Sequence, residues 1–495
     1  MSEFSDNSKL NELASFSSMH YIAPSVPRHS HPDLDQSAGH ICTSALSLAL
    51  SALAFPAVAL TSRKLQRALL AVVVLNISWQ IQKHFFLRED VADLGSLGGL
   101  QASLGNIALA GLYVAWLIES VTRRGSRDSV RRHLSAVTVS AALFLLFNAV
   151  SLLVASDATL GAFEVVSVLE RFLLYIYIAN KVSSREDVLF ILRILLIGLI
   201  IQSVLMLAQA AGLIQTIDWN GIKARTDFAG DPRVSGTLGS PNPAAAYLAM
   251  NMTFAFAVLL SGVGRVDKCL SSVGLFLALL PLLFTSSRGG WLSFLAGFIT
   301  VLLVSRSRAP RTLVAITVVA LIFVATSFVG PVGERLVGDD RGSAAARMPL
   351  NHLALAMIEE HPMLGVGSNN FSVAMQPYLA HAFTGDFVYT VHNTYLCVWA
   401  ETGIGGLIAF VWFLFSVLYR ALRVWLLRDY ALAFMSLGCA AAIMGFMIQM
   451  NFDPFRSGGA SHLIWLFGGL VTVMYRLSRK SLILSSTSMS PVIRT

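Results

Sequence analysis

Long apolar runs separated by short polar segments are the dominant pattern along this chain. A helix needs about 20 apolar residues to cross about 30 Å of hydrocarbon, because only a closed helix satisfies its backbone hydrogen bonds there. On that criterion we predict about thirteen membrane-spanning helices. They cover residues 41–61, 67–83, 98–120, 134–155, 159–179, 187–210, 243–263, 269–286, 289–304, 312–329, 393–419, 431–451 and 460–475.

Two of these runs also permit a second interpretation. The run at 67–83 is short and carries polar residues, and the run at 159–179 contains Glu164, Glu170 and Arg171. Charges are costly in lipid, so these side chains, and Arg193 in the next run, should face protein or water. Burial inside the bundle is therefore the alternative to lipid contact for both runs, and structural ion pairs are the favoured interpretation of the charges.

Lysine and arginine fall on one set of alternate loops if the thirteen spans are correct. They are Arg63, Lys64, Arg67, Arg123, Arg124, Arg127, Arg131, Arg132, Lys181, Arg185, Arg265, Lys268, Arg306, Arg308, Arg311, Arg420, Arg423, Arg428, Arg476, Arg479 and Lys480. Basic loops remain in the cytoplasm. This rule places the C-terminus inside, and the N-terminal tail and the long loops 211–242 and 330–391 outside.

Composition agrees with a membrane class. The 495 residues are 55% hydrophobic and 13% charged, whereas soluble chains average about 25% charged residues. We predict an all-α polytopic membrane protein with about 12–13 transmembrane helices and a large, partly helical outer loop. Its segments are a disordered tail (1–40), transmembrane helices (41–329, including loop 211–242), the large outer loop (330–391), C-terminal transmembrane helices (392–476) and a cytoplasmic tail (477–495).

The net charge and the positions of cysteine and histidine give no reason to expect nucleic acid, a metal ion or a cofactor as a partner. The charge of +8 sits mostly in the cytoplasmic loops and requires no nucleic acid. The cysteines lie in or beside predicted spans without paired spacing, and the loop histidines lack ligand spacing, so we expect neither metal nor cofactor. These residues are Cys42, Cys269, Cys397, Cys439, His352, His361 and His381.

Arginines on the predicted outer face suggest an anion site. Arg225 and Arg233 precede Asn242, which starts a predicted helix with Pro243 in its first turn. Helix N-termini and arginine forks bind anions. Arg288, in the turn Ser-Ser-Arg-Gly-Gly-Trp, lies on the same side, where positive charge is less expected. The alternatives are a solvated loop and an arginine reaching lipid phosphates.

The large outer loop contains one further predicted element. Residues 343–360 have apolar positions at helical spacing, which predicts an amphipathic helix at the membrane surface or over a cavity. Arg347 lies in this helix, and Pro362 ends it before a tight glycine turn.

The segment from His392 to Gly406 carries the candidate chemistry, because it joins the polar loop to an apolar helix. A neutral imidazole accepts a proton at physiological pH, which lysine and arginine do not. From these residues alone, a structural histidine at a helix start is the favoured interpretation. The alternative is that His392 is a catalytic base, with Asn393, Tyr395 and Glu401 as candidate supporting residues.

Four motifs together resemble the bacterial O-antigen ligase and O-antigen polymerase superfamily. The first is His392-Asn393 followed by Gly403 and Gly406, and the others are an arginine-glycine segment before a Pro-Asn start, a Ser-Arg-Gly turn and an arginine-led helix ending in Pro-x-x-Gly-x-Gly. Those three are carried by Arg233, Gly236, Pro241 and Asn242; by Ser287, Arg288 and Gly289; and by Arg347, Pro362, Gly365 and Gly367. They cover roughly residues 225–410. The N-terminal third matches only as generic membrane helices, and the family usually has about twelve spans.

The resemblance implies a membrane glycosyltransferase of GT-C-like architecture in the bacterial inner membrane. Such proteins take a glycan from an undecaprenyl diphosphate carrier at the periplasmic face. They transfer it, with inversion and without a metal, to a hydroxyl of an acceptor glycan, either the lipid A-core or a growing polysaccharide. Arg288, Arg233, Arg225 and Arg347 would bind the diphosphate, and His392 would activate the acceptor.

Alternatives to this function remain open at the level of sequence. A transporter or flippase of lipid-linked saccharide should show unwound mid-membrane helices and internal repeats, and neither is clear here. A scaffolding protein would tolerate loss of His392. Ligase and polymerase, including a polymerase of exopolysaccharide, are not separated by these residues, and the sugar and linkage are not encoded in any pattern we recognise.

Overall fold

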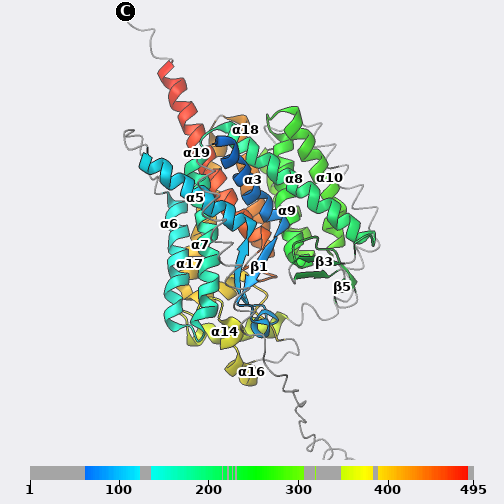
Figure 1. Ribbon diagram of the computed structural model, residues 1–495, viewed down its shortest axis with the longest axis vertical. Coiled ribbons are helices and arrows are strands. Elements are labelled where there is room, and N and C mark those ends of the chain that lie inside the picture. The colour runs from blue at the N-terminus through cyan, green and yellow to red at the C-terminus, as the bar shows by residue number, and fades with distance from the viewer. Residues whose placement is uncertain are drawn as a thin grey trace, which may run out of the picture. The chain divides into compact units, whose positions relative to one another are not determined.

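The computed structural model describes residues 62–122, 135–214, 233–305, 318, 347–382, 388–427, 429–456 and 458–488, together with the backbone of four short strands between residues 216 and 232 (Figure 1). The helices are α3 (Arg63–Trp79), α4 (Glu89–Ala92), α5 (Leu104–Thr122), α6 (Ala136–Val150), η1 (Ser151–Val154), α7 (Ala158–Lys181), α8 (Arg185–Ala210), α9 (Pro241–Leu260), α10 (Arg265–Phe284), α11 (Arg288–Ser305), α14 (Arg347–Glu360), α15 (Phe371–Ala374), α16 (Gln376–Ala382), α17 (Thr394–Leu426), α18 (Tyr430–Gln449) and α19 (Gly459–Ser488).

Three small antiparallel hairpins accompany the helices. They pair β1 (Gln82–Phe85) with β2 (Leu100–Ser103), β3 (Thr216–Trp219) with β4 (Ile222–Arg225), and β5 (Asp227–Phe228) with β6 (Asp231–Pro232). The predicted apolar run at 98–120 is therefore partly strand, and its helix begins only at Leu104.

The predicted membrane class is confirmed. Within the described ranges, nine helices are long and apolar enough to cross a membrane, and each matches one of the predicted runs. The predicted runs at 67–83 and 159–179 correspond to α3 and α7, which do not meet that criterion. The runs at 41–61 and 312–329 fall outside the described residues, apart from Val318.

The core of the bundle is built around α9. Of the 18-residue apolar stretch of α9, 94% is buried inside the protein, compared with 78% of the corresponding stretches of α18 and α19. Small residues permit this packing: Gly438 of α18 faces Phe254 and Ala257, and Gly290 of α11 faces Ala245. Close approach through small residues is a common way for membrane helices to associate.

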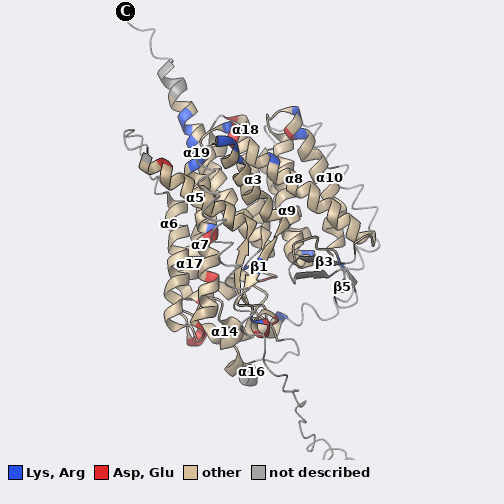
Figure 2. Cartoon of the chain, viewed as in Figure 1, with Lys and Arg blue, Asp and Glu red and all other residues tan. Residues whose placement is uncertain are grey.

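Basic residues gather at one end of the bundle. Lys181 pairs with Glu119 at 2.6 Å, Arg67 pairs with Asp187 at 3.0 Å, and Arg476 donates to the carbonyl of Ala179 at 2.8 Å. These contacts bring together the ends of α5 and α7, the starts of α3 and α8, and the middle of α19. Figure 2 shows the lysines and arginines concentrated there, whereas α14 and α16 lie at the opposite end.

Charges within the helices have protein partners, as predicted. Arg171 bonds Glu164 at 2.9 Å, two turns earlier on α7, so the two side chains share a face. Arg193 bonds Asp267 of α10 at 2.6 Å.

Candidate functional site

A group of polar residues lies at the end of the bundle that carries α14, and we call it the polar end cluster: Arg233, Asn242, Arg347, His392 and Asp453. A chain of hydrogen bonds joins three of them. Nη2 of Arg233 donates to Oδ1 of Asn242 at 3.0 Å. Nδ2 of Asn242 donates in turn to Oδ1 of Asp453 at 2.9 Å.

Asn242 differs from its predicted role as a helix cap. Helix α9 begins at Pro241, with Ser240 in extended conformation at the cap position. The proline supplies a pre-set φ and has no N–H to satisfy, which suits a first turn. The Asn242 side chain is thereby directed at Arg233 and Asp453 and links a cation to a carboxyl group.

Arg233 is bonded to the turn that precedes Arg288. Nε of Arg233 donates to the carbonyl of Thr285 at 2.7 Å, in the turn that leads into α11 at Arg288. Ser286 in this turn has a φ of 50°. Gly289, next to Arg288, packs against Gln449 and Phe452, beside Asp453.

The remaining predicted diphosphate ligands differ in how far the structure describes them. Arg225 ends β4, where only the backbone is described. Arg347 is the first residue of α14 and acts electrostatically on both His392 and Asp453. The predicted amphipathic helix is therefore present as α14, and it begins at this arginine.

Burial sets the charge of the two titratable groups in the cluster. It lowers the pKa of His392 from 6.5 to about 4, and the charge of Arg347 acts in the same direction. It raises the pKa of Asp453 from 3.8 to about 6, although Arg347, Asn242 and Arg233 oppose this. At neutral pH the imidazole is therefore uncharged and Asp453 is mostly ionised.

Thr394 joins the loop of Asp453 to the residues beside His392. Its backbone N–H donates to the carbonyl of Met450 at 2.8 Å, and its hydroxyl donates to the carbonyl of Asp453 at 2.7 Å. The ring of His392 lies 5.2 Å from that of Tyr389, centroid to centroid. The start of α17 thus determines where both the imidazole and the carboxyl group are held.

Two of the predicted supporting residues hold the backbone of this region. Asn393 caps α17, accepting from the N–H groups of Tyr395 at 2.9 Å and Leu396 at 3.1 Å. The hydroxyl of Tyr395 donates to the carbonyl of Met447 at 2.9 Å, which ties α17 to the last turn of α18.

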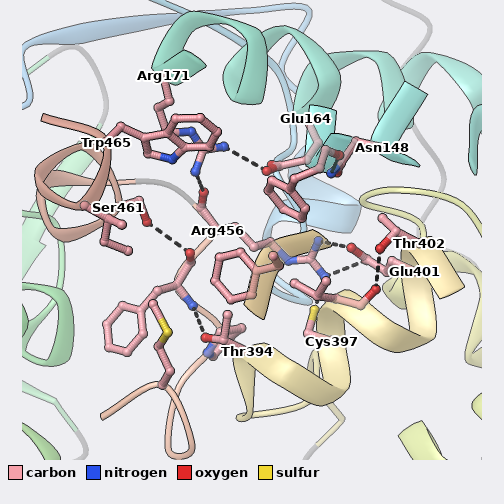
Figure 3. A pocket seen from close by; sticks show the side chains of 17 residues that line it. Asn148, Glu164, Arg171, Thr394, Cys397, Glu401, Thr402, Arg456, Ser461 and Trp465 are labelled. Carbon is pink, nitrogen blue, oxygen red and sulfur yellow. Dashed lines mark hydrogen bonds and ion pairs between the residues drawn. The ribbon is translucent and has the colours of Figure 1, made fainter. Parts of the chain in front are cut away.

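Glu401 belongs to a second charged group, which we call the buried ion network: Glu164, Arg171, Glu401 and Arg456. Its carboxylate forms a two-pronged pair with Arg456, with distances of 2.5 Å to Nη1 and 2.6 Å to Nη2. Arg171 donates to the carbonyl of Arg456. Figure 3 shows these side chains around a cavity of about 60 Å³.

Gly403 explains why the predicted motif contains a glycine at this spacing. Helix α17 is interrupted there by a φ of 70°. The interruption lets the carbonyls of Ala400 and Glu401 accept from the N–H groups of Val366 and Gly367, at 2.9 and 3.0 Å. A Cβ atom on Gly403 would lie 2.0 Å from the carbonyl oxygen of Met363.

Asp453 and Arg456 were not predicted from the sequence. Both belong to the short segment between α18 and α19, on the same predicted side as His392. A charged pair in so short a connection was the available signal. Among the described residues, no group of three His, Cys, Asp or Glu side chains is arranged to bind a metal ion.

Comparison with known proteins bears on the identity of this region. Residues 273–411 match the family described as O-antigen ligase. This range contains α14, His392 and the break at Gly403. A search of curated proteins gives no match. With nine apolar helices, the match points to a multi-pass inner-membrane protein. The resemblance to the O-antigen ligase and polymerase superfamily predicted from the motifs is thus confirmed over residues 273–411.

Proposed function

We propose that this protein transfers a glycan from an undecaprenyl-diphosphate carrier to a sugar hydroxyl, with inversion and without a metal, in O-antigen ligation or in O-antigen or exopolysaccharide polymerisation. The O-antigen ligase match supports glycosyl transfer of this type. The observation that carries the proposal is the polar end cluster itself, in which Asn242 links Arg233 to Asp453 and Thr394, two residues after His392, is bonded to the carbonyl of Asp453.

The membrane side follows from the distribution of charge. The basic end of the bundle, defined by Lys181, Arg67 and Arg476, corresponds to the cytoplasm by the positive-inside rule. The polar end cluster belongs to the opposite end, so we assign it to the periplasmic face. Lipid-linked donor and acceptor glycan would meet there.

The arginines are suited to the leaving group. A lipid diphosphate departs with its bonding electron pair, so stabilising that charge is the largest task of the site. Arginine forks bind phosphate oxygens in pairs, and we assign this role to Arg233 and Arg288, with Arg347 and Arg225 as further ligands. These fixed positive charges provide the electrostatic stabilisation that a divalent cation provides in other enzymes.

His392 has the properties of the proton acceptor. The acceptor hydroxyl oxygen attacks the anomeric carbon, its proton passes to the imidazole, and the bond from that carbon to the diphosphate oxygen breaks. A single displacement of this kind inverts the anomeric configuration. Burial keeps the imidazole uncharged at neutral pH. Because its low pKa makes it a weak base, proton transfer must accompany departure of the diphosphate. Asp453 would hold Arg233 through Asn242.

The test is His392→Ala, expressed from its own promoter in the native bacterium with the chromosomal copy deleted. General base catalysis contributes about 10²- to 10⁴-fold, so polysaccharide on a lipopolysaccharide gel should disappear while the protein remains in the membrane. Arg288→Ala should do the same. His352→Ala, an exposed histidine on α14, is the matched control. Normal polysaccharide in the His392→Ala strain would overturn the proposal.

The same gel distinguishes a ligase from a polymerase. Loss of a ligase leaves bare lipid A-core, because the finished glycan is never attached. Loss of a polymerase leaves core carrying single repeats, because attachment continues without elongation. Loss of a secreted polysaccharide alone indicates an exopolysaccharide polymerase.

A further inference from the structure

A second, larger cavity lies away from the polar end cluster, and we call it the α14 pocket. Its volume is about 670 Å³, and it lies between the end of α14, helix α16 and the segment joining η1 to α7. Ligand sites in proteins usually measure about 300–1,000 Å³. Its polar wall includes Ser156, Glu360, His361 and Tyr378.

The floor of the α14 pocket is held rigidly. The N–H of Val366 donates to the carbonyl of Ala400 at 2.9 Å. Asn370 and Asp157 exchange two hydrogen bonds, of 3.0 and 2.7 Å, which tie the floor to the start of α7. A Cβ atom on Gly365 would meet the backbone of Glu401 at 2.4 Å. Such a pre-formed surface loses little conformational freedom when a ligand binds.

The wall has the chemistry of a carbohydrate site. The hydroxyl of Tyr378 donates to Oε2 of Glu360 at 2.6 Å, so carboxylate, phenol and the imidazole of His361 are presented together. These groups donate to and accept from hydroxyls. The rings of Tyr378 and Pro377 supply apolar surface for the C–H faces of a sugar. A carboxylate at the rim disfavours a phosphate group, which argues against the diphosphate as the ligand.

We propose that the α14 pocket binds an oligosaccharide segment of the glycan substrate, at sugar units remote from the reacting one. This inference rests on the proposed function. Helix α14 runs from Arg347 to Glu360, and 14 helical residues extend about 20 Å. The pocket is therefore about one helix length from the arginine end of α14, which places it beyond the reach of the reacting sugar.

Binding can be measured without any transfer reaction. Ser156 is exposed and lines the pocket, so Ser156→Cys can carry an environment-sensitive fluorophore in the purified full chain. Cys397 and Cys439 are buried, and Cys269 is exposed, so Cys269→Ser and Cys42→Ser complete the background. The probes are delipidated core oligosaccharide and O-polysaccharide, each released from lipopolysaccharide of the native bacterium.

We expect a saturable fluorescence change with one of the two probes. The core oligosaccharide identifies the pocket with a lipid A-core acceptor, and the O-polysaccharide with the donor or growing glycan. Glu360→Gln and Tyr378→Ala should each weaken the apparent Kd about tenfold, since each removes one well-placed hydrogen bond or ring contact. Glu359→Gln, one residue outside the pocket, is the matched control and should bind as the parent does.

Two results would overturn the inference: no saturable change with either probe, or unchanged Kd values in both pocket variants. Adding His392→Ala distinguishes the two proposals. Retained binding with this change supports the pocket even if His392 proves dispensable for transfer. In a transfer assay with the purified Glu360→Gln protein, KM for the glycan should rise about tenfold with little change in kcat, because the reacting groups are intact.

Discussion

The polar end cluster and the buried ion network use the same residue types for different purposes. The network contains two arginines and two glutamates, so its formal charges cancel, and its side chains are at most 10% exposed. In the cluster, Arg233 donates to the carbonyl of Thr285 and to the amide oxygen of Asn242, and the amide nitrogen of Asn242 donates to Asp453. Arg233 and Arg347 against Asp453 leave the cluster net positive.

This difference in partners distinguishes the structural arginines of the network from the arginines to which we assign the diphosphate. A buried arginine that shares both its Nη atoms with one carboxylate has its charge compensated inside the protein. Arg233 is instead oriented by the neutral oxygens of Thr285 and Asn242, which fix the position of its guanidinium group. Helix α17 serves both groups, because Thr394 and Glu401 lie two turns apart on it.

The largest expected effect concerns the buried ion network. Arg456→Met leaves the Glu401 carboxylate buried without its partner, which should cost about 3–5 kcal/mol of unfolding free energy. Thermal unfolding of the detergent-solubilised protein measures this. The double variant Arg456→Met, Glu401→Met removes both charges and should recover most of the loss. A double variant no more stable than the single one would contradict the assignment of a structural pair.

Substitution of Asp453 should have an intermediate effect on the free energy of unfolding, and it should stabilise the protein, whereas Arg456→Met destabilises it. Its pKa is raised in the folded protein, so its contribution to stability is fully present below pH 3.8 and is lost as the pH rises through about 6. Asp453→Asn should therefore stabilise the protein at pH 8, by at most about 3 kcal/mol, and hardly at all at pH 4. The unfolding temperature at the two pH values is the measurement.

Asp453→Asn should lower the rate of glycan transfer, although it raises stability. If the ionised carboxyl group holds Arg233 and Arg347, the wild-type transfer rate falls as the pH drops through about 6. The Asp453→Asn variant should transfer slowly at all pH values and should not show this fall in rate near pH 6. His392 is not its origin, since burial keeps its pKa at about 4. If the transfer rate of the variant still fell as the pH dropped through about 6, Asp453 would have no part in the proposed mechanism.

The smallest effect should come from Asn393→Ala. The side chain caps α17 through two hydrogen bonds, and loss of such a cap costs about 1 kcal/mol. Asn393→Asp keeps the capping oxygen and serves as the control. If Asn393→Ala abolished transfer while the unfolding temperature fell by only a few degrees, Asn393 would belong with the reacting groups rather than with the backbone.

Much of the membrane architecture was predictable because it depends on local composition. An apolar run of sufficient length must form a helix in lipid, whatever its neighbours are, and nine described helices match predicted runs. The arginines at 233, 288 and 347 and the histidine at 392 could be proposed from the sequence for a similar reason, since each belongs to a short contiguous motif.

Only the tertiary structure decided which charged groups meet. Asp453 reaches Asn242 across 211 positions of sequence, and Arg456 reaches Glu401 across 55, so no local spacing contains either pair. Gly403 shows the same limit, because its place in the motif was visible while its cause, the carbonyl of Met363, lies in another segment. The sequence by itself determined the membrane class and the candidate residues, since helix formation in lipid is local. Packing of distant helices decided which charged groups come together, because the partners are far apart in sequence.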